Sequence, residues 1–332
     1  MIRQIPALEP NEGQRAQMAR RFGMFIHFGV NTFGNVQWSD GGIQARSFKP
    51  ETIDAEGWVK IAYQAGMNTV ILTCKHHDGF CLWNTETTNY GVMFSGKKVD
   101  IVRAVAQACA RYGLKFGVYY SLWDRSASCY RSDFEGEYIP YMFKQLTELL
   151  DGRYGEVVEL WLDGAWDKTR AQWHLDELYD LVKRLQPSCQ IGVNHTVGVD
   201  REMAEFPEER YLPQNVVRGD PLRMFPSDFR LWDPHSCRLD DPKIFTFQGE
   251  SYYLPFGMTI CSREGFSWFY SNIYEDEKLL DVNEVVEKCK TAFSAGNIVV
   301  INMPPDTSGH FVVQDVAHLM EISEKLGLSR GE

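Results

Sequence analysis

Several sequence patterns that would identify a class of protein are missing from this chain of 332 residues. No run is long and apolar enough to cross a bilayer, and residues 1–22 lack the continuous apolar stretch of a secretory signal. The eight cysteines include no C-x-x-C pair, so they do not indicate structural zinc. We therefore expect a reduced, cytoplasmic protein that has no membrane partner.

Signatures of nucleotide and nucleic-acid binding are missing too. The chain has no G-x-G-x-x-G or G-x-x-x-x-G-K-[ST] loop, and no G-x-S-x-G element of a serine hydrolase. Its formal net charge is −11, whereas a nucleic-acid partner requires a basic surface that neutralises phosphates. Aromatic residues are plentiful, with nine Trp and fifteen Tyr. Their rings suit either a hydrophobic core or the walls of a ligand pocket.

Short apolar runs alternate with longer amphipathic stretches along the chain. The short runs are nearly continuous in apolar residues, as expected of strands that are covered on both faces. They span residues 22–28, 68–74, 115–120, 157–162, 190–194 and 297–302, with weaker candidates at about 214–218 and 255–261. Helical patterns lie between them, for example after Asp100, the expected N-cap of a helix that ends at Gly113.

Repeated strand–helix alternation implies an α/β fold with a parallel sheet, and eight strands favour a closed barrel. We predict a single (β/α)8 barrel over residues 1–332, with its core at about 20–326. Residues 219–250 are poorly periodic and rich in Pro, Asp and aromatic residues, so we expect a long loop at the active-site end. No linker, repeat or low-complexity segment divides the chain.

Active sites of such barrels lie at the C-terminal ends of the strands, so the polar residues that follow each apolar run are informative. They are His27, His76, His77, Asp78, Tyr119, Tyr120, Asp163, Asn194, His195 and Asn302. Together they predict a polar and aromatic bowl that suits a polyol. Structural roles remain open, because His27 could be a core histidine and Asp163 a helix cap. An aspartate that ends an apolar strand between Trp161 and Trp166 is nevertheless well placed for a nucleophile.

The stretch KHHDGF, residues 75–80, could suggest a metal site. Adjacent residues of a strand point to opposite faces, and the chain has no H-x-H or H-x-x-x-H spacing. We therefore expect neither a metal nor a cofactor. His76 and His77 are better explained as hydrogen-bond partners of neighbouring hydroxyl groups.

Five segments now appear in one order: FGMFIHFGVNTF, AGMNTVILTCKHHDGFCLW, GLKFGVYYSLWD, VVELWLDG and AGNIVVINMPPDTSG. From about residue 20 to 326 the chain resembles the catalytic barrel of the α-L-fucosidases of glycoside hydrolase family 29. The resemblance implies a retaining exo-enzyme that removes α-L-fucose from a fucosylated glycan or oligosaccharide through a covalent intermediate. It implies that Asp163, in the LWLDG motif, is the nucleophile.

The same resemblance implies a set of sugar-binding residues around Asp163, with Trp268 packed near the C5 methyl group of fucose. They are His27, Trp38, His76, His77, Tyr119, Trp161 and Trp268. A retaining glycosidase also needs an acid/base carboxyl group about 5–5.5 Å from the nucleophile. Counting from Asn194 favours Glu208, in a stretch, EFPEER, that could also be a solvated acidic loop. Other candidates are Glu205, Glu209, Asp228, Asp233 and Glu250.

Three departures from the family pattern leave other functions open. Gln37 replaces the Glu of an E-W motif, Gly257 stands near a position where a carboxylate is often found, and we expect no β-sandwich domain after the barrel. The chain could therefore be a relative that hydrolyses another α-linked sugar, or a sugar-binding homologue without turnover. The sequence does not indicate the linkage preference, nor does it distinguish a monomer from a homo-oligomer.

Overall fold

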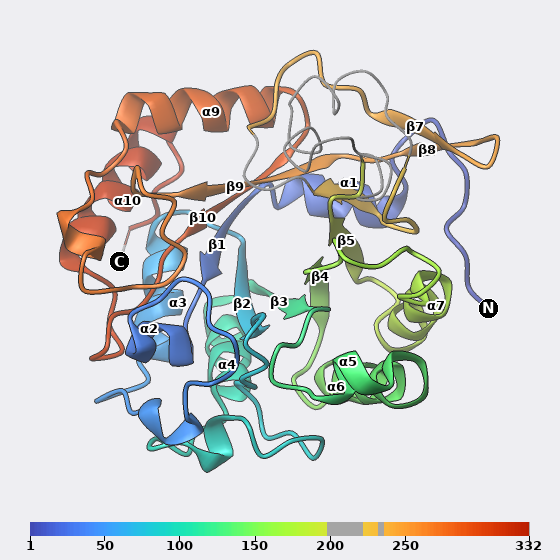
Figure 1. Cartoon of the computed structure of the whole chain (residues 1–332). Coiled ribbons are helices and arrows are strands. Elements are labelled where there is room, and N and C mark those ends of the chain that lie inside the picture. Colours follow the sequence, from blue (N-terminus) through green and yellow to red (C-terminus); the bar gives the residue numbers. More distant parts are fainter. Residues whose placement is uncertain (198–221, 232–235, 332) are drawn as a thin grey trace.

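Eight parallel strands close into a barrel in the order β1-β10-β9-β6-β5-β4-β3-β2 (Figure 1). The structure, a computed structural model, describes residues 1–197, 222–231 and 236–331. The barrel strands are β1 (Phe22–Ile26), β2 (Thr69–Lys75), β3 (Lys115–Ser121), β4 (Val157–Asp163), β5 (Gln190–Asn194), β6 (Phe229–Leu231), β9 (Phe256–Cys261) and β10 (Ile298–Asn302). An antiparallel hairpin, β7 (Ile244–Phe247) and β8 (Glu250–Tyr253), precedes β9.

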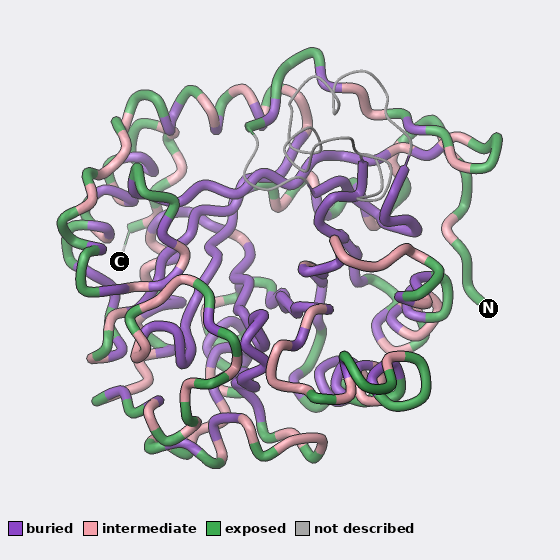
Figure 2. Tube along the Cα trace, in the orientation of Figure 1, coloured by how far each residue is buried: buried purple, intermediate pink, exposed green. Residues whose placement is uncertain are grey.

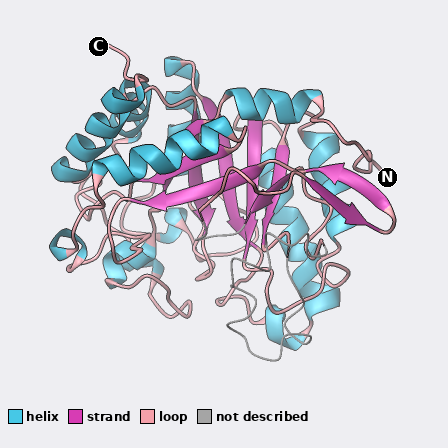
Figure 3. Cartoon of the chain, turned by 90° about the horizontal axis from the view of Figure 1, so that it is seen from above, coloured by secondary structure: helices cyan, strands magenta, loops and turns pink. Residues whose placement is uncertain are grey.

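Helices surround the strands, which lie in the middle of the view in Figure 3. The α-helices are α1 (Glu12–Ala19), α2 (Val30–Gly34), α3 (Ala55–Gln64), α4 (Ile101–Tyr112), α5 (Cys129–Ser132), α6 (Ile139–Leu150), α7 (Leu175–Leu185), α9 (Val282–Ser294) and α10 (Val313–Leu326). Short 3₁₀-helices are η1 (Ala45–Ser47), η2 (Val92–Phe94) and η5 (Tyr274–Asp276), and η3 (Phe134–Tyr138) is a π-helix. Across the described ranges, none of the helices combines the length and the apolar composition that crossing a membrane requires.

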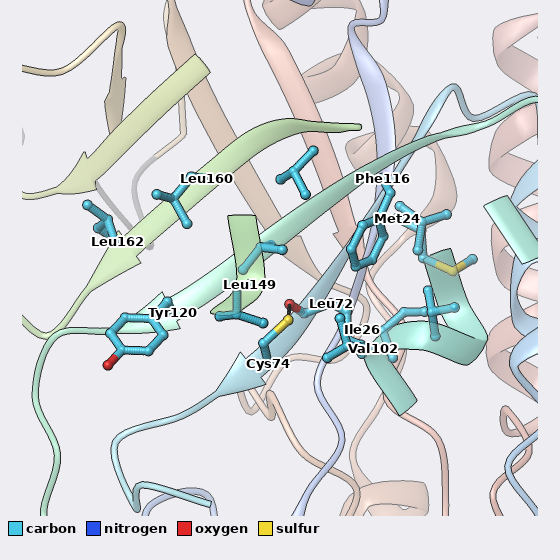
Figure 4. Close-up of a cluster of buried hydrophobic side chains, with 14 of the residues drawn as sticks. Met24, Ile26, Leu72, Cys74, Val102, Phe116, Tyr120, Leu149, Leu160 and Leu162 are labelled. Atoms are coloured by element: carbon cyan, nitrogen blue, oxygen red, sulfur yellow. Dashed lines mark hydrogen bonds between the residues drawn. The ribbon is translucent and has the colours of Figure 1, made fainter. Parts of the chain in front are cut away.

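Alternation of side chains along the strands creates two apolar layers. The outward-facing layer joins strands to helices: Figure 4 shows side chains of β1 to β4 together with Val102 of α4 and Leu149 of α6. The inward-facing layer fills the barrel with Phe25, Ile71, Tyr119, Trp161, Phe229, Leu231 and Val300. Burial is accordingly concentrated on the strands (Figure 2). A residue that follows an inward-facing one by two positions also faces the barrel axis.

The N-terminal end of the barrel is closed by α1. Asn11 caps this helix, and the side chain and backbone of Asn11 and Gln14 bond reciprocally in a capping box. The buried side-chain amide of Gln14 donates hydrogen bonds to the carbonyls of Asp228 (2.6 Å) and Tyr253 (2.7 Å). The opposite, C-terminal end of the barrel is therefore the end at which a cavity can open.

The predicted barrel is confirmed, and most predicted strands match to within two residues. The run at 190–194 is β5, and the weaker candidate at 255–261 contains β9. Asp100 caps α4 by accepting from the Arg103 N–H, and Gly113 ends it with a φ of +67°. The candidate strand at 214–218 lies outside the described residues. The sixth barrel strand is β6 instead, and it was missed.

The prediction of one long active-site loop over residues 219–250 is wrong for the described part of that segment. It contains β6 and β7, and the hairpin that begins there lies against the N-terminal segment through a bridge between Ala7 and Tyr252. Phe245 and Tyr252 of the hairpin are buried in a small separate cluster. Because β6 has only three residues and carries Arg230 between Phe229 and Leu231, its sequence shows no strand periodicity.

Candidate active site

Strand alternation brings polar side chains together at the C-terminal end of the barrel. Asp163, Asn194 and Asn302 are the last residues of β4, β5 and β10, and each follows an inward-facing position by two. His27 follows the inward-facing Phe25 by two positions. These side chains therefore point toward one axis although their strands are far apart in the sequence.

A cavity of about 200 Å³ lies at this end of the barrel. Every residue predicted to bind sugar lines it, as does Asp163 at the end of β4. The complete lining is Phe25, His27, Trp38, His76, His77, Tyr119, Trp161, Leu162, Asp163, Trp166, Asn194, His195, Leu231, Phe266 and Trp268. Aromatic and imidazole rings dominate this lining, and within the described residues Asp163 is its single carboxylate.

Asp163 is held by several donors and has no lysine or arginine partner among the described residues. Its Oδ1 accepts hydrogen bonds from Asn194 Nδ2 (3.0 Å) and from the Gly164 N–H (2.7 Å). Its Oδ2 accepts one from the Tyr119 hydroxyl (2.8 Å) and lies 3.6 Å from His77 Nε2. Gly164 is needed because its φ is +74° and a Cβ there would lie 2.8 Å from the Trp123 Cβ.

These contacts keep Asp163 ionised. Burial raises the pKa of its carboxyl group, but the positive charge that His77 carries when it is protonated at acidic pH, together with the hydrogen bonds from Asn194, Tyr119 and the Gly164 N–H, outweighs burial. The net result is a pKa below the usual value for aspartate. A carboxylate at the base of a cavity is thus available as a nucleophile at neutral pH.

The proton positions on His27 follow from its neighbour Asn302. The Asn302 side-chain NH2 group donates to the carbonyls of Trp268 (2.9 Å) and Ser267 (3.4 Å), so its oxygen faces His27 Nδ1 at 2.7 Å. An amide oxygen can only accept, so Nδ1 carries the proton. Burial lowers the pKa of His27 to about 3, which leaves Nε2 as a neutral acceptor.

His77 is fixed in the same way by Ser121. The Ser121 hydroxyl donates to the Trp123 carbonyl (2.6 Å), so its oxygen accepts from His77 Nδ1 at 2.7 Å. Burial lowers the pKa of His77 to about 4, and the ring is neutral at pH 7 with an acceptor at Nε2. Burial likewise lowers the pKa of His76, whose Nδ1 is buried without a hydrogen bond. Neutral imidazoles on the lining offer acceptors to the hydroxyl groups of a ligand.

The other polar residues of KHHDGF stabilise the turn that carries these histidines. Lys75 is buried and pairs with Asp124 (3.0 Å) while also donating to the Tyr120 hydroxyl. Asp78 accepts from the Phe80 N–H (2.7 Å) and from Asn31 Nδ2 (3.0 Å). Within the described residues, no group of three or more His, Cys, Asp or Glu side chains is arranged to hold a metal ion.

Indole rings form the rim of the cavity. Trp38 is half exposed and stacks on Trp166, with ring centroids 5.8 Å apart and planes 5° apart. Trp38 also contacts the His77 ring edge-on at 5.0 Å. On another side Trp268 lies 5.1 Å from the His27 ring. Apolar faces thus flank the polar base, an arrangement that suits a ligand with both hydroxyl groups and apolar C–H surface.

The structure separates the acid/base candidates into two groups. Asp228 is buried beside β5 and β6, and Glu250 is exposed on β8; neither lines the cavity. These two candidates are therefore excluded by position. The remaining candidates, Glu205, Glu208, Glu209 and Asp233, lie outside the described residues.

Sequence reasoning assigned no role to several residues that shape the cavity. Asn194 and Asn302 were noted only as polar residues at strand ends, yet they orient Asp163 and His27. Asn302 follows the inward-facing Val300 by two positions on the same strand, so strand parity could have identified it. Phe266, at a φ of +54° in an irregular segment, has no comparable signal in the sequence. Gln37 was noted as a substitution, but it does not line the cavity.

Comparisons with known proteins find similar sequences and similar structures in one family of glycoside hydrolases. A family model described as alpha-L-fucosidase matches residues 32–329. Alpha-L-fucosidase 1 of Arabidopsis thaliana is 32% identical over 96% of this chain and 60% of its own length. A putative alpha-L-fucosidase of Bacteroides ovatus has a crystal structure that is 29% identical, with a TM-score of 0.73 over 95% of this chain and 55% of that one. A glycoside hydrolase 29 family member of an unknown rumen bacterium is 25% identical, with a TM-score of 0.76 over 98% and 58%.

Proposed function

The chain belongs to the α-L-fucosidase family, and from this premise we propose that it is a retaining exo-α-L-fucosidase with Asp163 as its nucleophile. The observation that carries the proposal is the ionised Asp163 carboxylate at the base of a cavity lined by histidine and tryptophan. The chain spans about 60% of the length of the curated relatives that it matches first. The activity and substrates of the whole protein are therefore part of the proposal.

In the first step, an oxygen of Asp163 attacks the anomeric carbon of a terminal α-L-fucosyl residue. We assign this role to Oδ2, because Oδ1 accepts two hydrogen bonds whereas Oδ2 accepts one, from Tyr119. The C1–O bond to the aglycone breaks as the new bond forms, and an acid donates a proton to the departing oxygen. The product is a covalent fucosyl–aspartyl ester.

In the second step, water attacks the anomeric carbon of the ester. The same acid/base residue, now a carboxylate, takes the proton of the water. Asp163 leaves as a carboxylate, which is stabilised by the hydrogen bonds from Tyr119, Asn194 and Gly164. Glu208 is the proposed acid/base, with Glu205, Glu209 and Asp233 as the alternatives. No step in this scheme requires a metal or a cofactor.

The ring of the sugar would be held by acceptors and by apolar faces. His27, His76 and His77 accept hydrogen bonds from its hydroxyl groups, which suits their neutral state. Trp38, Trp161 and Trp268 contribute apolar surface, and the C5 methyl group of a 6-deoxy sugar needs such a surface. A fucosylated glycan or oligosaccharide is therefore the proposed substrate.

Hydrolysis of 4-nitrophenyl α-L-fucoside, followed by proton NMR, tests the proposal. We expect turnover and α-L-fucose as the first product, because two displacements at one carbon retain its configuration. β-L-Fucose as the first product would contradict the retaining mechanism. Faster turnover of an α-galactoside would favour a relative with another substrate. Fucose binding without turnover of any aryl glycoside would favour a sugar-binding protein.

A further inference from the structure

Gln37 ties two loops of the cavity wall together through its side-chain amide. Its Oε1 accepts hydrogen bonds from the backbone N–H groups of Trp268 (2.8 Å) and Phe269 (2.9 Å). Its Nε2 donates to the carbonyl of Phe269 (2.8 Å). Gln37 lies in the connection after α2, whereas Trp268 lies in the segment after β9. A single side chain therefore makes three hydrogen bonds to a backbone more than 200 residues away.

The backbone of Trp268 is held on its other side as well. Asn302 Nδ2 donates to the Trp268 carbonyl (2.9 Å), and Asn302 Oδ1 faces His27 Nδ1. Gln37 and Asn302 thus fix the N–H and the carbonyl of one residue. The indole ring of that residue lies 5.1 Å from the His27 ring on the cavity lining.

The geometry requires an amide at position 37. A carboxylate could accept from the two N–H groups, but it cannot donate to the Phe269 carbonyl. An anionic oxygen in place of Nε2 would stand about 3 Å from the carbonyl oxygen, where the two repel each other and the carbonyl loses its partner. A protonated carboxyl group would restore one donor. Glutamate would therefore fit this position only at low pH.

We propose that Gln37 is a positioning residue that fixes Trp268 against the bound sugar, acting on substrate binding without touching the substrate. The identity of that sugar rests on the proposed function above. Position 37 is thus not a vacant contact to the ligand. All of the Gln37 side-chain hydrogen bonds within the described residues go to the backbone of the cavity wall. The next residue, Trp38, lines another part of the same cavity.

Hydrogen exchange of the Trp268 and Phe269 amides tests the inference without any use of catalysis. We expect Gln37→Ala to increase their exchange by at least about tenfold, because both N–H groups lose their acceptor. Asn35→Gly is the matched control. It removes a hydrogen bond between the same two loops, from the Asn272 N–H to Asn35 Oδ1, and glycine accommodates the φ of +58° at that site. Unchanged exchange at Trp268 and Phe269 in Gln37→Ala would overturn the inference.

Steady-state kinetics on 4-nitrophenyl α-L-fucoside separates positioning from general stability. We expect Gln37→Ala to raise KM about tenfold with little change in kcat, and Asn35→Gly to leave both unchanged. For Gln37→Glu, KM should be raised at pH 7 and should return toward the parent value as the pH falls through the pKa of the new carboxyl group. A KM that follows the parent at every pH would refute the amide requirement. If the parent hydrolyses no fucoside, the proposed function fails, while the exchange experiment still decides the role of Gln37.

Discussion

The two ends of the barrel each hold an aspartate with similar hydrogen-bond partners but different surroundings. At the N-terminal end, Asp228 accepts hydrogen bonds from the Tyr179 hydroxyl (2.8 Å) and the Ile191 N–H (2.9 Å), and it pairs with Lys183 at 2.7 Å. At the C-terminal end, Asp163 also accepts from a tyrosine and a backbone N–H. Within the described residues, however, it has no lysine or arginine partner, and it faces a cavity.

This difference distinguishes a structural carboxylate from the proposed nucleophile. Asp228 is paired with Lys183 at 2.7 Å, and it does not line the cavity at the C-terminal end of the barrel. The charge of Asp163 is stabilised by neutral dipoles, so it remains available to an electrophile. The presence of a tyrosine hydroxyl alone would not separate these two residues.

The largest expected effect comes from removing the carboxylate at the cavity. Asp163→Gly should lower kcat/KM for an aryl α-L-fucoside on the order of 10⁴-fold, because no covalent intermediate can form. Added azide can occupy the vacated space and attack C1 from the same face. We therefore expect azide to restore turnover and to give a β-L-fucosyl azide, identified by NMR. Activity that survives in Asp163→Gly would refute the assignment.

The next largest effect should identify the second carboxyl group at the cavity end. Glutamine variants at Glu205, Glu208 and Glu209 serve as controls for one another. We expect Glu208→Gln to lower kcat/KM for a fucosylated oligosaccharide about 10²- to 10³-fold. An aryl fucoside with a good leaving group needs little proton donation, so its first step should be far less affected. A larger loss at Glu205 or Glu209 would move the assignment to that residue.

Removing the charge at the opposite end should affect stability but not catalysis. Asp228→Asn leaves Lys183 without its partner in a largely buried position, which should lower the free energy of unfolding by about 3 kcal/mol. Urea titrations of both proteins would measure the change. We expect kcat/KM to stay within about twofold of the parent, since Asp228 is absent from the cavity lining. A selective loss of activity would break the distinction between the two aspartates.

Tyr119→Phe should lower catalysis by less than the substitutions of Asp163 and Glu208. Asp163 loses one charge-assisted hydrogen bond, which corresponds to a decrease in kcat of about tenfold because the departing carboxylate is less stabilised. The pKa of Asp163 should rise, so a higher pH is needed to keep it ionised. The acidic limb of the pH profile of kcat/KM should accordingly move to higher pH in the variant. A limb that stays in place would show that Tyr119 does not control the ionisation of Asp163.

Much of the fold could be predicted because buried parallel strands leave a strong signal. The predicted run at 190–194, which is apolar at 191–193, is β5. The strand β6 gave no such signal, because it has three residues and its outward side chain is Arg230. That arginine is buried and lies near Asp241 and the Phe256 ring, interactions that only the tertiary structure creates.

The candidate site was predictable where it depends on strand ends and not where it depends on loops. Asp163 and His27 stand at fixed positions relative to apolar runs, so the barrel geometry alone brings them together. The direction of the Gln37 side chain depends on the backbone path of residues 266–269, which no local pattern specifies. Its substitution was visible in the sequence, but its hydrogen bonds were not.

The shortness of β6 has a consequence for how the barrel comes apart. This strand is registered with β9 through only two residue pairs, Arg230 with Phe256 and Leu231 with Gly257. Few backbone hydrogen bonds therefore join β6 to β9. We expect thermal fluctuations to separate this pair of strands before any other pair in the barrel. On its other side β6 pairs with β5, which ends at Asn194. Early opening at β6 would therefore weaken the hydrogen bond from Asn194 to Asp163 while the rest of the barrel stays folded.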